Sequence, residues 1–202
     1  MKSEKTLWAV GIAIVIAALP AVADPADVGR AVSLELGMGT QGIMSYEEVG
    51  IRIPAGSNGF SIALSARFMS SLTWATFTNL STSSSVSFHP DVAAGVVSFG
   101  GASPLLYGIL RAHGAAELLL GYSFTPWDSA IYGVPNLIGP NITFALMGTF
   151  GLELFTAPRV SVCLDAGGGW KSIVGDKTNP FVIAGSWLGS GFGIRMGMRF
   201  YL

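Results

Sequence analysis

Few side chains in this sequence could carry out chemistry, and the clearest group surrounds His89. Asp91 follows His89 closely, and Ser85 and Ser87 stand just before it. A histidine with a serine and a carboxylate could act as a general base and its nucleophile, as in hydrolases. No lipase, deacylase or protease motif accompanies these residues, and such a site requires a fixed geometry. We therefore expect His89 to be an exposed loop residue, the protein not to be an enzyme, and no residue to be catalytic.

Metal and cofactor chemistry has no support in the sequence either. His113 is distant from His89 along the chain, and Cys163 is the single cysteine. Two distant histidines and one thiol do not form the ligand set of a zinc site, and one cysteine cannot form an intramolecular disulfide. We expect no metal and no cofactor, and we interpret Cys163 as a small buried residue rather than a reactive thiol.

Most other charged side chains alternate with apolar ones along extended stretches, most clearly in residues 191–202. Apolar residues fill the even positions from Phe192 to Leu202, whereas the odd positions hold Arg195, Arg199, Tyr201 and two glycines. A period of two indicates a β-strand with one apolar face. That face could meet the core of a soluble sandwich or the lipid around a membrane barrel.

The composition favours the barrel over the sandwich. Charged residues make up 11% of the chain, against about 25% in globular proteins. After residue 23 no apolar run is long enough for a membrane helix, which needs about 20 residues. A closed barrel lets an apolar chain face lipid while all its backbone groups are paired. The formal net charge of −1 and the absence of a basic patch predict no nucleic-acid partner. Besides a barrel with a structural role and a barrel that transports solutes, a soluble periplasmic β-sandwich is the third interpretation of this sequence.

The first residues have the form of an export signal. Lys2 and Lys5 precede an apolar run from Leu7 to Leu19, and Pro20 is followed by an Ala-Val-Ala sequence that ends at residue 23. A basic start, a short apolar run and an Ala-x-Ala site are typical of a signal peptide. We therefore expect a cleaved signal peptide at 1–23 and one barrel domain at 24–202.

Alternation predicts eight strands, the smallest even number that closes a membrane barrel. Their expected ranges are 31–39, 45–53, 60–69, 91–99, 105/114–124, 142–155, 159–171 and 187–202. We expect the connections at the outer, cell-surface end of the barrel to be long, at 40–44, 70–90, 125–141 and 172–186. The turns at the inner, periplasmic end would be short, at 54–59, 100–104 (or up to 114) and 156–158. The Ser/Thr-rich stretch 70–90 reads as a flexible solvated loop. We expect aromatic girdles near the strand ends, formed by Phe60, Phe68, Tyr122, Phe124, Phe144, Trp170 and Phe200.

The stretch 100–114 is the least determined part of this topology. Ser103 could cap a short interfacial helix that begins at Pro104 and ends before Gly114. We favour a continuation of the strand, with His113 near the inner rim. Dividing 105–124 into two strands would give ten, but it would place the long connection 125–141 on the side of the short turns.

When the apolar face of each predicted strand is turned to the lipid, the opposite, inner face carries both acids and arginines. An eight-stranded interior is just wide enough to be filled by side chains, and unpaired charges away from water are costly. We expect these side chains to pair and close the lumen, in a structural plug; the alternative is a narrow gated pore lined by the same charges. The predicted lumen charge network comprises Glu35, Glu48, Arg52, Arg67, Glu117, Glu153, Asp165, Arg195 and Arg199.

The end of the chain also resembles the C-terminal assembly signal of bacterial outer-membrane barrels. Arg195, Gly197 and Phe200 match its polar-x-Gly-x-x-apolar pattern, while Leu202 stands where an aromatic residue is commoner. The whole domain resembles small OmpA-, OmpX- or OmpW-like barrels. This resemblance implies an outer-membrane location, outer-membrane lipid and the barrel assembly machinery as partners, extracellular ligands at the loops, and a monomer. It implies a structural or surface-interaction role, with transport of small solutes as the alternative.

Overall fold

The computed structural model describes residues 31–55, 59–72, 75–79, 84–88, 91–124, 141–174 and 190–202. The predicted signal peptide lies outside these ranges, as do His89, residues 125–140 and residues 175–189. Within the described ranges, no helix is long and apolar enough to cross a membrane.

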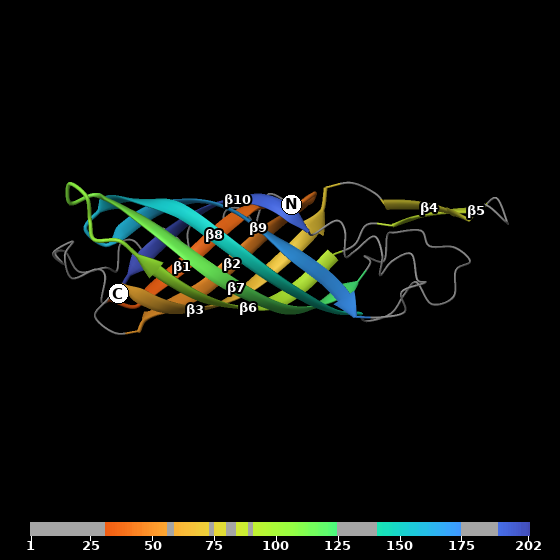
Figure 1. The fold of residues 1–202 in the computed structure, drawn as a ribbon, viewed down its shortest axis with the longest axis horizontal. Helices are drawn as coiled ribbons and strands as arrows, with labels where there is room; N and C mark the ends of the chain where they lie inside the picture. The colour runs from red at the N-terminus through yellow and green to blue at the C-terminus, as the bar shows by residue number, and fades with distance from the viewer. Residues whose placement is uncertain are drawn as a thin grey trace, which may run out of the picture.

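Eight antiparallel strands close into a barrel, which confirms the predicted fold (Figure 1). Around the barrel the order is β1-β10-β9-β8-β7-β6-β3-β2. The strands are β1 (Ser33–Gln41), β2 (Met44–Pro54), β3 (Phe60–Ser71), β6 (Asp91–Ala102), β7 (Leu110–Phe124), β8 (Asn141–Ala157), β9 (Val160–Val174) and β10 (Gly191–Tyr201). The first and last strands pair in one register from Ser33↔Tyr201 to Gln41↔Gly193, as expected, and we call this pairing the seam.

The barrel has two different ends. At one end, which we call the turn end, short connections follow Pro54, Ala102 and Ala157, and the C-terminus lies there (Figure 1). At the opposite loop end, the strands β4 (Ala75–Asn79) and β5 (Ser84–Phe88) form a separate two-stranded sheet beyond the barrel (Figure 1). The prediction that 70–90 is wholly a flexible loop was therefore wrong. The hairpin register sets Phe77 opposite Val86, and such residues favour strands over loops.

The connection between β6 and β7 contains a tight turn rather than a helix. Tyr107 and Gly108 both have positive φ, at 54° and 72°, and the Ile109 N–H donates to the Leu106 carbonyl at 3.2 Å. Two successive positive φ angles are typical of a type I′ hairpin turn. Ser103, the candidate helix cap, instead pairs with Ala112, because its N–H donates to the Ala112 carbonyl at 2.8 Å. The strand interpretation is thus confirmed for residues 110–113 and wrong for residues 103–109, which form the connection.

The outer wall of the barrel is apolar. Leu64, Leu120, Phe150, Leu164 and Ile194 are each more than half exposed. These side chains alternate with the inward ones and point away from the lumen. They form an apolar belt on the outer surface, which water solvates poorly.

Aromatic residues near the strand ends contribute to the same wall. Phe60, Phe68, Tyr122 and Trp170 are exposed, whereas Phe200 is only 1% exposed and so departs from the expected girdle. Phe144 meets Trp170 edge to face, with 6.2 Å between ring centroids.

Candidate functional site

The charged lumen is the candidate site, because the closed sheet turns one face of every barrel strand inward. Five of the predicted residues are almost fully buried there: Arg67, Glu117, Glu153, Asp165 and Arg199. The register explains several of the contacts, since it places acid and base directly opposite one another on adjacent strands. These cross-strand pairs are Glu48↔Arg67, Asp165↔Arg195, Glu35↔Arg199 and Arg111↔Glu153.

A first group of ionic side chains, the central cluster, crosses the middle of the lumen. Arg67 Nη2 lies 2.6 Å from Glu48 Oε2 and 2.6 Å from Glu117 Oε2, so one guanidinium joins two carboxylates. Arg195 Nε lies 2.7 Å from Asp165 Oδ2, and its Nη1 lies 3.2 Å from Glu117 Oε1. Glu117 on β7 therefore bridges arginines of β3 and β10, two strands that are not neighbours in the barrel. The cluster comprises Glu48, Arg67, His113, Glu117, Asp165 and Arg195.

Two aromatic rings contact the arginines and carboxylates of the central cluster. The Nε2 atom of His113 contacts the second oxygen of Asp165, so this carboxylate is held by both a histidine and Arg195. The guanidinium of Arg67 lies over the ring of Tyr46, 4.5 Å from its centroid. A cation over an aromatic face gains electrostatic stabilisation without a further hydrogen bond.

A second group, the turn-end cluster, fills the lumen next to the short turns. Arg52 binds Glu35 through two nitrogens, at 2.6 and 3.3 Å. Arg199 donates to Glu35 as well, and its Nη1 lies 2.9 Å from Glu153 Oε2. Arg199 thus links the two carboxylates of this section. The cluster comprises Glu35, Arg52, Arg111, Glu153, Ser161, Arg199 and Tyr201.

Glu153 is the most heavily used acceptor in the turn-end cluster. Its side chain is fully buried, and Oε2 accepts from Arg111 Nε at 2.6 Å as well as from Arg199. The other oxygen accepts from the hydroxyls of Ser161 and Tyr201. All of its acceptor directions are satisfied, as a buried carboxylate requires.

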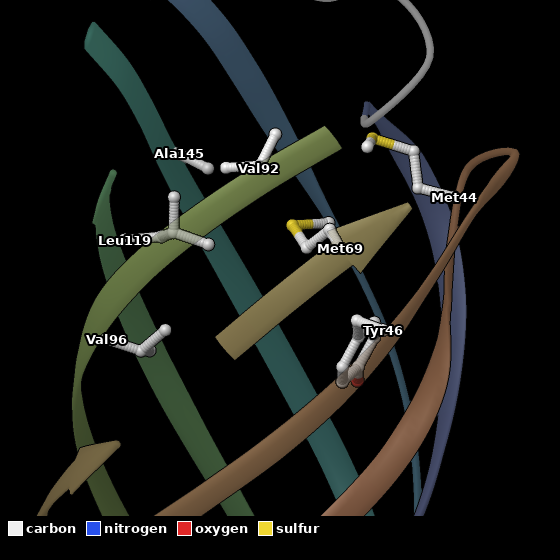
Figure 2. Packing of buried hydrophobic residues seen from close by; sticks show 7 residues of the cluster. All are labelled: Met44, Tyr46, Met69, Val92, Val96, Leu119 and Ala145. Carbon is white, nitrogen blue, oxygen red and sulfur yellow. The ribbon is translucent and has the colours of Figure 1, made fainter. Parts of the chain in front are cut away.

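The loop end of the lumen has a different character. A group of inward side chains there is apolar, and Figure 2 shows them gathered between strands β2, β3, β6, β7 and β8. Lys171 is a buried basic residue of this section, and its Nζ lies 3.2 Å from the Met44 sulfur. The lumen is therefore ionic over its central and turn-end sections and largely apolar at the loop end. The apolar group comprises Met44, Tyr46, Met69, Val92, Val96, Leu119 and Ala145.

Three ionisable residues of the lumen were absent from the predicted network. Arg111 and His113 share the phase of Glu117 along β7, and Lys171 shares the phase of Asp165 along β9. Arg111 and His113 were missed because the start of β7 was uncertain in the sequence, and extending that strand from 114 in steps of two would have found them. Lys171 lies within the predicted strand 159–171, and its phase alone places it on the inner face.

Cys163, Asp91 and the C-terminal segment were also singled out in the sequence, and the structure places each of them in or next to a barrel strand. Cys163 is buried in the lumen wall, 3% exposed. Asp91 begins β6, where it accepts a hydrogen bond from Ser70 Oγ at 2.7 Å. In the candidate assembly signal, Arg195 points into the lumen, while Leu202 is 64% exposed. The role of this C-terminal segment in barrel assembly stays a prediction.

Little free space is left between the ionic side chains. A cavity of about 20 Å³ lies beside Glu35, Glu48 and Cys163, and another of about 30 Å³ lies nearer the turns. One water needs at least roughly 10–15 Å³ of such space. Each cavity therefore has room for one or two waters and not for a larger solute.

Comparison with known proteins finds the same barrel fold in solved structures. No family model matches the sequence, and no curated protein matches it. The structure is similar to the N-terminal β-barrel domain of Pseudomonas aeruginosa OprF, with a TM-score of 0.51 and 11% identity over 86% of this chain and 98% of that one. Neisserial surface protein A (NspA) is a further neighbour, with a TM-score of 0.47 and 10% identity over 85% and 94%. The chain thus has the fold of the small eight-stranded outer-membrane β-barrels.

Proposed function

We propose that this chain is an outer-membrane β-barrel whose lumen is closed by ion pairs and whose role is structural or is exerted at the cell surface. The apolar belt supports membrane insertion, because Leu120, Phe150 and Leu164 would otherwise stand in water over half their surface or more. A closed sheet has no unpaired edge, which is the requirement for β-structure within lipid. The barrel assembly machinery and outer-membrane lipid are the partners that follow from this proposal.

The observation that carries the closed-lumen proposal is the continuity of the ionic network. Glu48, Arg67, Glu117, Arg195 and Asp165 form an unbroken chain of ion pairs across the central section. Removing one partner of a buried pair costs about 3–5 kcal/mol. Opening a water-filled path would require breaking several such pairs together, which favours a plug over a pore. Contact with other molecules then falls to the loop end, where the β4–β5 sheet stands beyond the barrel (Figure 1).

Two experiments test this proposal. The refolded protein should migrate faster on a gel before boiling than after it, and should float with lipid vesicles, because a folded barrel resists detergent. In planar bilayers it should show no stable conductance on the nanosiemens scale. Stable channels of that size would refute the closed lumen, and a protein that stays soluble and monomeric without detergent would refute the membrane barrel.

A narrow gated pore is the second candidate, and one observation favours it. The cavities of about 20 and 30 Å³ share Arg195 and Arg199 in their walls. Movement of these two side chains, with loss of their ion pairs, is the gating step that this candidate requires. Brief, small conductance steps that disappear when the membrane potential is removed would support this candidate over the permanent plug.

A further inference from the structure

The cavity of about 30 Å³ near the turn end has an unusual wall. Four arginines and a histidine line it, and none of the lumen carboxylates does. The carboxylates lie behind the arginines: both oxygens of Glu35 accept from Arg52, and one of them also accepts from Arg199. Positive groups thus face this space without an acid. Its polar lining comprises Arg52, Ser61, Arg111, His113, Arg195, Arg199 and Tyr201.

The arginines of this wall retain unused hydrogen-bond donors. Arg111 donates through Nε and Nη2, while Arg195 and Arg199 donate through Nε and Nη1. This leaves Nη1 of Arg111 and Nη2 of both Arg195 and Arg199 without an acceptor among the residues that the structure describes. Each guanidinium has five N–H donors, so the ion pairs do not exhaust them.

A second, independent observation concerns His113, which lines the same cavity. Its side chain is 8% exposed, and its Nδ1 atom is buried with no hydrogen-bond partner. Its Nε2 atom is already engaged by Asp165. A buried polar atom without a partner is uncommon in a folded protein and calls for an explanation such as an ion or water.

The charges of the two clusters must be counted together, because Arg195 and His113 of the central cluster line the same cavity. Their arginines balance their carboxylates five to five, so the arginines alone leave no surplus charge. Since Nε2 of His113 engages Asp165, its Nδ1 carries an N–H only in the imidazolium form. A monovalent anion at Nδ1 would be the counter-ion of that form and would also accept the free guanidinium N–H groups, as anions commonly do with arginine.

We propose that this cavity binds a single small inorganic anion of the size of chloride or bromide, held by Arg111, Arg195, Arg199 and His113. The size of the cavity excludes phosphate and organic anions, since about 30 Å³ holds only one or two waters. The ion would complete the lumen plug by satisfying donors that the protein's own carboxylates leave free. This site does not depend on whether the lumen conducts.

Diffraction from crystals of the full chain soaked in sodium bromide tests the site directly. The expected result is an anomalous peak in the cavity, within contact distance of the guanidinium nitrogens. A map with no peak there, or with peaks on the protein surface only, would overturn the proposal. This measurement needs no substitution, so it cannot be lost to a folding defect.

A pair of variants provides the matched test in solution. Ala115 lines the cavity, whereas its neighbour Ala116 faces outward and is exposed. Ala115→Val should fill the cavity and leave every ion pair in place, and Ala116→Val adds the same methyl groups outside. The midpoint of urea unfolding is measured as chloride replaces gluconate at constant ionic strength, because a ligand that binds only the folded state raises stability along its binding curve.

The wild type and Ala116→Val should show a saturable rise of the midpoint with chloride, and Ala115→Val should lose that rise. Absence of a saturable rise in the wild type would contradict the proposal. An unchanged rise in Ala115→Val would contradict it equally, since the ion would then bind elsewhere.

Discussion

Replacing Glu153 by glutamine tests whether the ion-pair network stabilises the barrel. The side chain is fully buried and accepts hydrogen bonds from Arg111 at 2.6 Å and Arg199 at 2.9 Å, as well as from two hydroxyls. Glu153→Gln keeps the shape but removes the charge, so Arg111 loses the carboxylate with which it pairs. Removal of one partner of a buried pair costs about 3–5 kcal/mol, and we expect a loss of that size in the free energy of unfolding.

Glu47→Gln is the matched control, because it makes the same chemical change on the outer side of β2, where Glu47 is exposed. Glu47 lies opposite Phe68 near the loop end of β2, and changes of charge near the membrane interface cost about 0–1 kcal/mol. Both variants are unfolded in urea with lipid vesicles present, and the folded fraction is read from gel mobility. If Glu153→Gln unfolds at the same urea concentration as Glu47→Gln, the network does not stabilise the fold and our reasoning is refuted.

The double variant Glu153→Gln with Arg111→Gln separates the pair from its surroundings. If the two side chains stabilise each other, the double variant should lose less stability than the sum of the single losses, and the difference measures their coupling. Simple additivity would show that the 2.6 Å contact contributes nothing beyond each side chain alone.

Two further predictions concern the wall of the barrel. A Cβ at Gly151 would lie 2.1 Å from Asp165 Oδ1 and 2.5 Å from the Leu164 carbonyl, so Gly151→Ala should displace Asp165 and lower the urea midpoint. Gly148→Ala is its control, because a Cβ at Gly148 would meet no atom within 4 Å. Equal urea midpoints for the two variants would contradict this geometry. Phe150 lies near the middle of β8 and is 64% exposed, while Ile142 is 54% exposed at its loop end. Arginine should cost about 2–4 kcal/mol at the first position and about 0–1 at the second in vesicles, and equal costs would show that β8 does not cross the bilayer.

The sequence predicted the barrel well because alternation between charged and apolar residues is strong where the lumen is ionic. Arg195 stands between Ile194 and Met196, and Arg199 follows Met198, so the faces of β10 could be assigned without a structure. The phase of each strand then placed acids and arginines inside, and the need to leave no open edge predicted the seam between the first and last strands.

The same signal disappears where both faces are apolar. In β6, Val92 and Val96 point inward while Val97 and Phe99 have outward phase, so the stretch shows no contrast between its faces. This is why the apolar section at the loop end was not predicted. The turn at Tyr107 was missed for another reason: a tyrosine with positive φ is rare, and asparagine or glycine is the usual signal.

The seam has a consequence for the order of folding. Glu35 and Arg199 form an ion pair across it although 164 positions separate them in the chain. Contacts so distant in sequence form late, because the entropy of closing the intervening loop is lost before the contact stabilises anything. Until β10 reaches β1, the growing sheet keeps two unpaired edges, which in lipid cannot be satisfied by water. The ion pair at the seam would therefore act as a latch, favouring the closed cylinder over a sheet that has inserted but not yet joined its ends.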